Sequence, residues 1–261
     1  MQLDDAFANA AYIRQAADFP PRWAREAEAF RAGLGSRAAL AISYGPSPRQ
    51  AYDLFRSETE QRGTLVFVHG GYWLKFDRSS WSHLAQGALA RGWNVAIPSY
   101  DLCPQVRIAE ITDQIARAVS HIAKTSEGPI SLTGHSAGGH LVSRMLAPGM
   151  LAPDVLGRIH SVAPISPVTD LRPLLQTSMN DAFRMDMSDA EAESPVVQPA
   201  PDRPVKIWVG ADERPVFVEQ AAALGAAWGM PHVVVPDRHH FDVIEALLDP
   251  DSEMVRFLTQ D

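Results

Sequence analysis

Residues 130–146 read ISLTGHSAGGHLVSRML, and the order of residue types in this stretch decides the fold. Ile130 to Thr133 is typical of a buried strand, and Ala137 to Leu146 is typical of a helix. Between them lies Gly134-His135-Ser136-Ala137-Gly138, a G-x-S-x-G motif. A strand, a tight turn and a helix in this order predict a nucleophile elbow, in which flanking glycines make room for a strained serine. The start of the helix directs backbone N–H groups at developing negative charge.

Strands and helices alternate on both sides of this stretch. The pattern predicts further strands over 39–44, 52–55, 64–68, 94–97, 159–165, 205–209 and 233–235. It predicts helices over 4–18, 22–34, 79–91, 110–124 and 216–228, and a closing helical region from Asp242. The first two strands are joined by a short turn and predict a hairpin. The rest of the alternation predicts an α/β fold, with a mostly parallel central sheet covered by helices on both faces.

The length of 261 residues is ordinary for one α/β domain, so we expect a single domain over 1–261. Its front part, 1–38, is predicted to be helical, with Pro20-Pro21 separating two helices. Residues 170–198 are polar and poorly periodic, and they interrupt the alternation where an inserted lid would belong. Phe183 and Met185 are the apolar candidates in that lid for covering a pocket.

Composition and charge exclude several classes of protein. The formal net charge of −8 argues against general nucleic-acid binding, which needs a basic face. No apolar run approaches the ~18 residues of a membrane helix, and the start, Met1-Gln2-Leu3-Asp4-Asp5, is acidic where a secretory signal would be basic. The single Cys103 fits a reducing compartment. We therefore expect a cytoplasmic protein that acts on a small molecule, and the sequence leaves a homodimer open.

A second motif, His69-Gly70-Gly71-Tyr72-Trp73, directly follows the predicted strand at 64–68. A serine hydrolase needs at least two donors for its oxyanion. One is the backbone N–H of the residue after the nucleophile, here Ala137, and the other comes from a loop after an earlier strand. The His-Gly-Gly segment suits that loop, because its backbone is bare enough to approach a substrate. A flexible turn is the alternative reading of the two glycines.

The elbow requires an acid and then a histidine later in the chain. His239-His240 follows the last predicted strand, and His240 is the better base because it directly precedes the closing helical region. The strand at 205–209 is followed by Asp212 and Glu213, and spacing alone does not decide between these two carboxylates. The remaining histidines show no metal-ligand spacing, so neither a metal nor another cofactor is expected.

Taken together, these motifs resemble the arylformamidase (kynurenine formamidase) group of α/β-hydrolases. The likeness runs from about Leu3 to the closing helix. An aromatic pair after His-Gly-Gly is more selective than the elbow, which many esterases share. The segments that carry the resemblance are Tyr44-Gly45-Pro46, Asp53-Leu54-Phe55, His69-Gly70-Gly71-Tyr72-Trp73, Ser99-Tyr100-Asp101-Leu102-Cys103-Pro104, Gly134-His135-Ser136-Ala137-Gly138-Gly139-His140-Leu141 and His240-Phe241.

The resemblance implies an α/β-hydrolase fold and the hydrolysis of N-formyl-L-kynurenine to kynurenine and formate, by a triad that uses no metal. It places the nucleophile at Ser136 and the base at His240. The family acid stands three residues after a glycine and shortly before Pro-x-Phe, which corresponds to Glu213 here. Many members have Asp instead, which keeps Asp212 as the alternative.

The expected mechanism follows from these assignments. The N–H groups of Gly71 and Ala137 bind the oxyanion, while Gly70 makes room for it. Tyr72 and Trp73 either flank an aromatic substrate or pack their loop against the core.

Two other functions compete with this reading. A broad carboxylesterase would use the same triad on small or aryl esters. A non-catalytic binding protein on a hydrolase fold would lack one member of the triad, whereas Ser136, a late acid and His240 are all present in the required order.

Overall fold

The computed structural model describes residues 3–59 and 61–260, so Met1, Gln2, Glu60 and Asp261 of the predicted domain lie outside the described residues. Within the described part, the strands form one eight-stranded sheet. They are β1 (Ala38–Ser43), β2 (Ala51–Phe55), β3 (Gly63–Val68), β4 (Trp93–Pro98), β5 (Ile130–His135), β6 (Ile159–Ile165), β7 (Ile207–Gly210) and β8 (His232–Val235). Each predicted strand is present, most with bounds shifted by one or two residues.

The strand order is β1-β2-β4-β3-β5-β6-β7-β8. The predicted hairpin of β1 and β2 is antiparallel, and β2 also pairs antiparallel with β4. All other neighbours are parallel, from β4 and β3 across to β7 and β8. The carboxyl ends of β3, β5, β7 and β8 therefore lie at the same edge of the sheet, which is where open α/β folds bind ligands.

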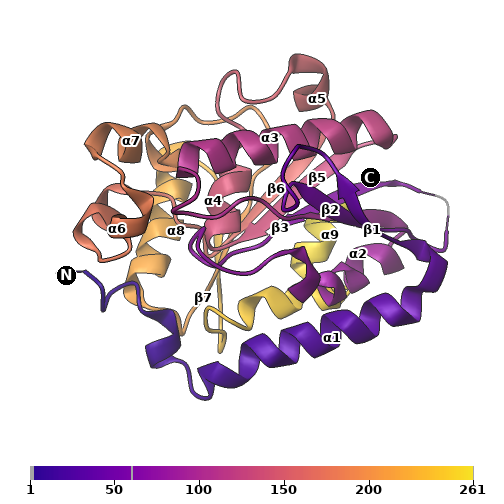
Figure 1. The fold of residues 1–261 in the computed structure, drawn as a ribbon, viewed down its shortest axis with the longest axis horizontal. Helices are drawn as coiled ribbons and strands as arrows, with labels where there is room; N and C mark the ends of the chain where they lie inside the picture. Colours follow the sequence, from indigo (N-terminus) through magenta and orange to yellow (C-terminus); the bar gives the residue numbers. More distant parts are fainter. Residues whose placement is uncertain (1–2, 60, 261) are drawn as a thin grey trace.

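Helices cover both faces of the sheet (Figure 1). One face carries α3 (Ile108–Thr125), α4 (Ala137–Arg144) and α8 (Pro215–Trp228), and the other carries α1 (Phe19–Leu34), α2 (Gln86–Ala90) and α9 (Glu253–Thr259). Three shorter helices are α5 (Pro153–Gly157), α6 (Asn180–Phe183) and α7 (Met187–Ala192). The described residues include no helix with the length and apolar character needed to cross a membrane.

The central strand β3 shows why the sheet needs apolar residues on both faces. Its alternate residues Val66 and Val68 pack with the helices of the α3 face, whereas Leu65 and Phe67 pack with the α1 face. All four are at most 1% exposed. Because successive side chains of a strand point to opposite faces, a strand covered on both sides reads as a continuous apolar run. This is the pattern from which the strand was predicted.

Three helical predictions are wrong in detail. Residues 79–91 form two 3₁₀ helices, Arg78–Ser80 and Ser82–Ala85, before the short α2. Residues 4–18 form turns and two 3₁₀ helices rather than one α-helix. Pro20-Pro21 lies inside the first turn of α1 instead of before it. Proline is tolerated there because first-turn N–H groups have no partner within the helix.

The stretch 170–198 lies between β6 and β7 and consists of short elements, among them α6 and α7. Phe183 is completely buried and Met185 is 7% exposed, and both belong to the core on the α3 face. We expected these two residues to cover a pocket, and that expectation is wrong. They instead pack the stretch 170–198 against the rest of the domain.

Candidate active site

Ser136 lies between β5 and α4, at the carboxyl edge of the sheet. Its φ of 56° and ψ of −116° fall in a region that residues with a side chain rarely adopt. The Ser136 N–H donates to the carbonyl of Ile165 at 2.9 Å, and its own carbonyl accepts from the N–H of His140 at 3.0 Å. Hydrogen bonds to the next strand and to α4 thus hold Ser136 on the strained turn that the motif predicts.

The turn also depends on two glycines of the motif, because other backbone comes very close to them. A Cβ on Gly138 would stand 1.9 Å from the carbonyl oxygen of Val68, at the end of β3. A Cβ on Gly134 would stand 2.3 Å from the carbonyl oxygen of Gly138. Neither distance is compatible with a side chain, so only glycine lets α4 begin directly beside β3.

The loop after β3 brings bare backbone to the serine. A Cβ on Gly70 would lie 3.0 Å from the Cβ of Ser136, and Gly71 has a φ of 110°, a conformation that favours glycine. Among the described residues, no backbone acceptor meets the N–H of Gly71 or that of Ala137, the first residue of α4. Both N–H groups are therefore free of backbone partners in the described chain, as binding of an oxyanion would require.

His240 and Glu213 form a buried pair, and His240 lines the same cavity as Ser136. Nδ1 of His240 lies 2.5 Å from Oε2 of Glu213, whose side chain is completely buried. The other carboxylate oxygen accepts from the N–H of Gly210 at 2.8 Å and from the hydroxyl of Ser166. Because a carboxylate only accepts hydrogen bonds, it holds the proton of a neutral His240 on Nδ1 and leaves Nε2 free to act as a base.

The two competing residues lie elsewhere. Asp212 is exposed, and its backbone N–H is its one hydrogen-bonding group with a partner in the described part of the chain, the carbonyl of Arg238. His239 lies 3.2 Å from Asp242, measured from Nδ1 to Oδ1, and its ring packs 5.3 Å from that of Phe19. Among the candidates from sequence, the structure brings together Glu213 and His240.

The two aromatic residues after Gly71 have different surroundings. Tyr72 lines the cavity that contains Ser136, and its hydroxyl donates to the carbonyl of Phe7 at 2.8 Å. Trp73 is completely buried, with its ring 5.1 Å from His140 and 5.6 Å from Phe183. The expectation that Trp73 contacts substrate is therefore corrected, because this ring packs the loop against the core.

The cavity at Ser136 has a volume of about 770 Å³. Ser136, His135 and His240 form its polar floor, together with Gly70, Gly71 and Tyr72. Most of the remaining wall is apolar and comes from the front of the chain and the loop after β3. These residues are Phe7, Ala8, Ala10, Ala11, Ala16, Ala17, Pro20, Trp23, Leu74, Phe76 and Trp81, with Met179 and Phe241 completing the wall.

Two further histidines beside the serine are kept neutral by burial. The ring of His135 lies 4.5 Å from that of His240, and burial, with a smaller contribution from His240, holds the pKa of His135 well below its usual value. Burial lowers the pKa of His69 to about 4, although the carbonyl of Gly70 accepts from its Nδ1 at 2.8 Å. Near pH 7 these two rings add no positive charge to the site.

Comparison with known proteins identifies the family. A family model described as the alpha/beta hydrolase fold matches residues 65–232. Kynurenine formamidase of Drosophila melanogaster is 30% identical over 83% of this chain and 79% of its own length. The chain belongs to the α/β-hydrolases, as an arylformamidase-like member. The resemblance drawn from the motifs is thereby confirmed, and the chain is a hydrolase of amide or ester bonds.

Other relatives of this α/β-hydrolase agree with that assignment. Kynurenine formamidase of Salmo salar is 24% identical over 85% of the chain and 81% of its own length. Among solved structures, a candidate thioesterase from Silicibacter sp. TM1040 is 58% identical, with a TM-score of 0.98 and 99% of each chain covered. Esterase B of Lactobacillus rhamnosis, at 17% identity, a TM-score of 0.66, and 93% and 92% coverage, shares the fold.

Sequence reasoning missed several residues of the hydrolase site. Ser166, which donates to Glu213, directly follows β6 at the same edge of the sheet, and that position was the available signal. The front segment 7–23 lines the cavity, whereas from the predicted lid at 170–198 only Met179 does so. Nothing in the alanine-rich front sequence distinguishes a cavity wall from a helix packed on the core.

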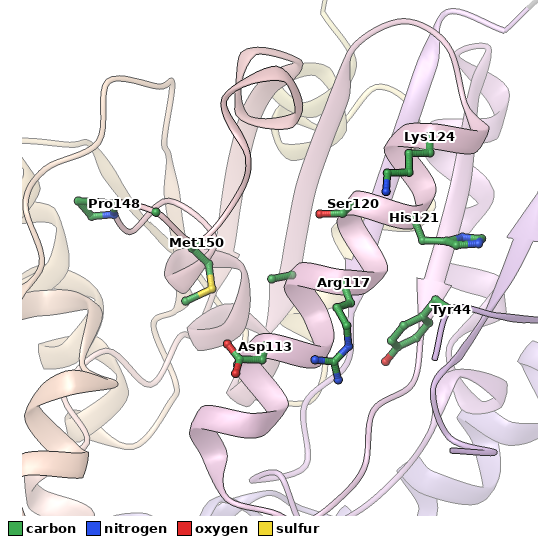
Figure 2. Close-up of a pocket in the computed structure, with 10 residues that line it drawn as sticks. Tyr44, Asp113, Arg117, Ser120, His121, Lys124, Pro148 and Met150 are labelled. Carbon is green, nitrogen blue, oxygen red and sulfur yellow. The ribbon is translucent and has the colours of Figure 1, made fainter. Parts of the chain in front are cut away.

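A second hollow of the hydrolase lies along the outer surface of α3 (Figure 2). Asp113, Arg117, His121 and Lys124 of α3 line it, and Met150 lies opposite. It contains none of the predicted site residues. Nowhere in the described chain do three or more His, Cys, Asp or Glu side chains gather as a metal site would require.

Proposed function

We propose that this α/β-hydrolase cleaves aryl formamides, with N-formyl-L-kynurenine as its substrate and L-kynurenine and formate as its products. Ser136 is the nucleophile, His240 the general base and acid, and Glu213 the residue that orients the imidazole. One observation carries the proposal: Ser136 and His240 line one cavity, and a fully buried Glu213 lies 2.5 Å from His240. The relatives named kynurenine formamidase support the choice of substrate.

Acylation begins when Nε2 of His240 takes the hydroxyl proton of Ser136 as its oxygen attacks the formyl carbon. The carbonyl π electrons move to oxygen, and the N–H groups of Gly71 and Ala137 stabilise this oxyanion. The oxyanion then re-forms the carbonyl, the carbon–nitrogen bond breaks, and His240 returns its proton to the departing amine. Glu213 remains a carboxylate and stabilises the imidazolium throughout.

Deacylation repeats these steps with water. His240 removes a proton from a water molecule, whose oxygen attacks the formyl ester on Ser136. The second oxyanion is stabilised by the same two N–H groups and collapses to formic acid as His240 protonates the serine oxygen. The formic acid then loses its proton to solvent and leaves as formate. No metal or organic cofactor takes part in the proposed cycle.

The cavity suits an aromatic amine as the leaving group. Its volume of about 770 Å³ lies within the usual range for small-molecule sites, and its wall is largely apolar. The ring of Tyr72 and the indoles of Trp23 and Trp81 line this wall. Edge or offset contacts with an aromatic substrate are worth ~0.5–1.5 kcal/mol each.

The competing function is hydrolysis of esters or thioesters with the same residues, and the 58% identical candidate thioesterase is the observation that favours it. The deciding experiment measures kcat/KM on N-formyl-L-kynurenine, p-nitrophenyl acetate and S-phenyl thioacetate in parallel. We expect the formamide to be preferred and Ser136→Ala to lose turnover of all three. A large preference for the ester or thioester, with the formamide barely hydrolysed, would reject the formamidase proposal.

Labelling by a fluorophosphonate tests the nucleophile separately. Wild type is expected to gain the adduct on Ser136 and the Ser136→Ala variant to remain unlabelled. An unlabelled wild type would instead favour a binding protein on a hydrolase fold.

A further inference from the structure

The polar side chain of Asn9 stands in the otherwise apolar front wall of the cavity. The residue is 7% exposed, and among the described residues no hydrogen-bond partner meets its side-chain oxygen. Burying an amide without partners costs stability, so buried polar groups are nearly always paired. An unpaired amide oxygen in the wall of a substrate cavity is explained if the substrate supplies a hydrogen-bond donor.

The segment around Asn9 is held firmly, which fixes the amide in the wall. On one side, the carbonyl of Phe7 accepts from the hydroxyl of Tyr72 at 2.8 Å. On the other side, the guanidinium of Arg214 stacks 3.6 Å from the ring centroid of Tyr12. Neither contact involves the Asn9 side chain, so these contacts do not explain why a polar residue stands at this position.

Lys75 is the one Lys or Arg that lines the same cavity within residues 3–59 and 61–260. It is exposed, and no carboxylate of the described chain lies within ion-pair distance of its ammonium group. The whole protein carries a net charge of −8, which disfavours the approach of anions at long range. A local unpaired cation at the cavity therefore offsets this repulsion for an anionic substrate.

We propose that Asn9 and Lys75 form a subsite for a charged head group on the part of the substrate remote from the scissile bond. The head group is an α-amino acid group: its carboxylate pairs with the ammonium of Lys75, and its own ammonium donates to the side-chain oxygen of Asn9. This inference rests on the proposed function and extends it. It assigns the residues that make the enzyme prefer zwitterionic aryl formamides over neutral ones as substrates.

The test compares two formamides that share the same ring and scissile bond. N-formyl-L-kynurenine carries the amino acid chain, and N-formyl-2-aminoacetophenone ends in a methyl group instead. We expect wild type to favour the first in kcat/KM by at least tenfold. Asn9→Leu and Lys75→Met should each lower that ratio about tenfold through a higher KM, and added salt should weaken the effect of Lys75. Turnover of the shorter formamide reports that each variant is folded.

Lys124→Met is the matched control, because Lys124 is an exposed lysine that lines the α3 hollow (Figure 2) and does not line the cavity at Ser136. It should leave the ratio within twofold of wild type. An unchanged ratio in both Asn9→Leu and Lys75→Met would overturn the subsite while leaving the formamidase proposal intact.

Failure of the proposed function gives a different result, namely that wild type hydrolyses neither formamide. The subsite is then tested with two aryl acetates whose leaving group carries either a zwitterionic 2-amino-2-carboxyethyl group (O-acetyl-L-tyrosine) or a methyl group (p-cresyl acetate). The same loss of preference in the two variants would support the subsite, and its absence would reject it.

Discussion

Replacing Glu213 by Gln exchanges one carboxylate oxygen for an NH₂ group in a completely buried site. In the wild type, Oε1 accepts from the N–H of Gly210 at 2.8 Å and from the Ser166 hydroxyl, while Oε2 accepts from His240 at 2.5 Å. The amide oxygen of Gln must remain on the side of the two donors. The new NH₂ group therefore faces Nδ1 of His240 and donates to it.

This donation reverses the imidazole tautomer. With Nδ1 acting as an acceptor, the proton of neutral His240 moves to Nε2, which can then no longer take the proton of Ser136. In serine proteases, the corresponding change of acid to amide preserves the geometry and lowers kcat about 10⁴-fold. We expect a loss of about 10³- to 10⁴-fold here, which corresponds to about 4–5.5 kcal/mol of transition-state stabilisation.

The assay measures kcat and KM of Glu213→Gln on N-formyl-L-kynurenine, with Asp212→Asn as the matched control. The control changes an exposed carboxylate one position away and should keep kcat within twofold. KM should stay nearly constant in both, because neither side chain lines the cavity. If Glu213→Gln kept more than a tenth of wild-type kcat, or if Asp212→Asn lost as much, the reasoning from the buried pair would be refuted.

Three further predictions follow from the same structure. Gly71→Ala should lower kcat about 10²-fold or more in steady-state assays, because its Cβ would stand 2.6 Å from the carbonyl of Lys75 and displace an oxyanion donor. Tyr72→Phe removes the hydrogen bond to Phe7 and should raise KM several-fold while leaving fluorophosphonate labelling intact. Burial lowers the pKa of His140 to about 4, below the ~6.5 expected when unfolded, so its contribution to stability is present above pH 6.5 and lost as the pH falls. In urea titrations, the stability advantage of wild type over His140→Asn should therefore shrink by roughly 1.4 kcal/mol per pH unit between pH 6.5 and 4.

The edge of the sheet that carries the site was predictable from sequence, because strands buried on both faces leave a strong local signal. Val66 and Phe67 of β3 point to opposite cores, so their strand reads as one apolar run whatever its neighbours are. The glycines of the elbow are dictated just as locally, by the approach of Val68 to Gly138. Structural features that depend on a few adjacent residues can therefore be predicted without knowledge of the tertiary structure.

Residue spacing alone could not predict whether Asp212 or Glu213 is the carboxylate that pairs with His240. Both carboxylates follow β7 on one loop, and a rotation of that loop would exchange them. The decision is made by groups distant in sequence: Ser166 donates to Glu213, and the buried ring of His240 completes its surroundings. The family resemblance selected Glu213 because it carries such tertiary information indirectly, through the Pro-x-Phe that follows.

The cavity wall is the part of the site that could least be predicted from the sequence. The front segment is tied to a position more than 200 residues later, since Arg214 binds the carboxylate of Asp5 at 2.8 Å and stacks on the ring of Tyr12. Arg214 directly follows Glu213, so the loop that supplies the acid also anchors the wall that would contact the far end of a substrate. Periodicity within the front segment cannot reveal a partner so far along the chain. The same connection implies that a change in this wall can alter substrate choice without displacing the pair of Glu213 and His240, since Gly210 and Ser166 hold that carboxylate independently.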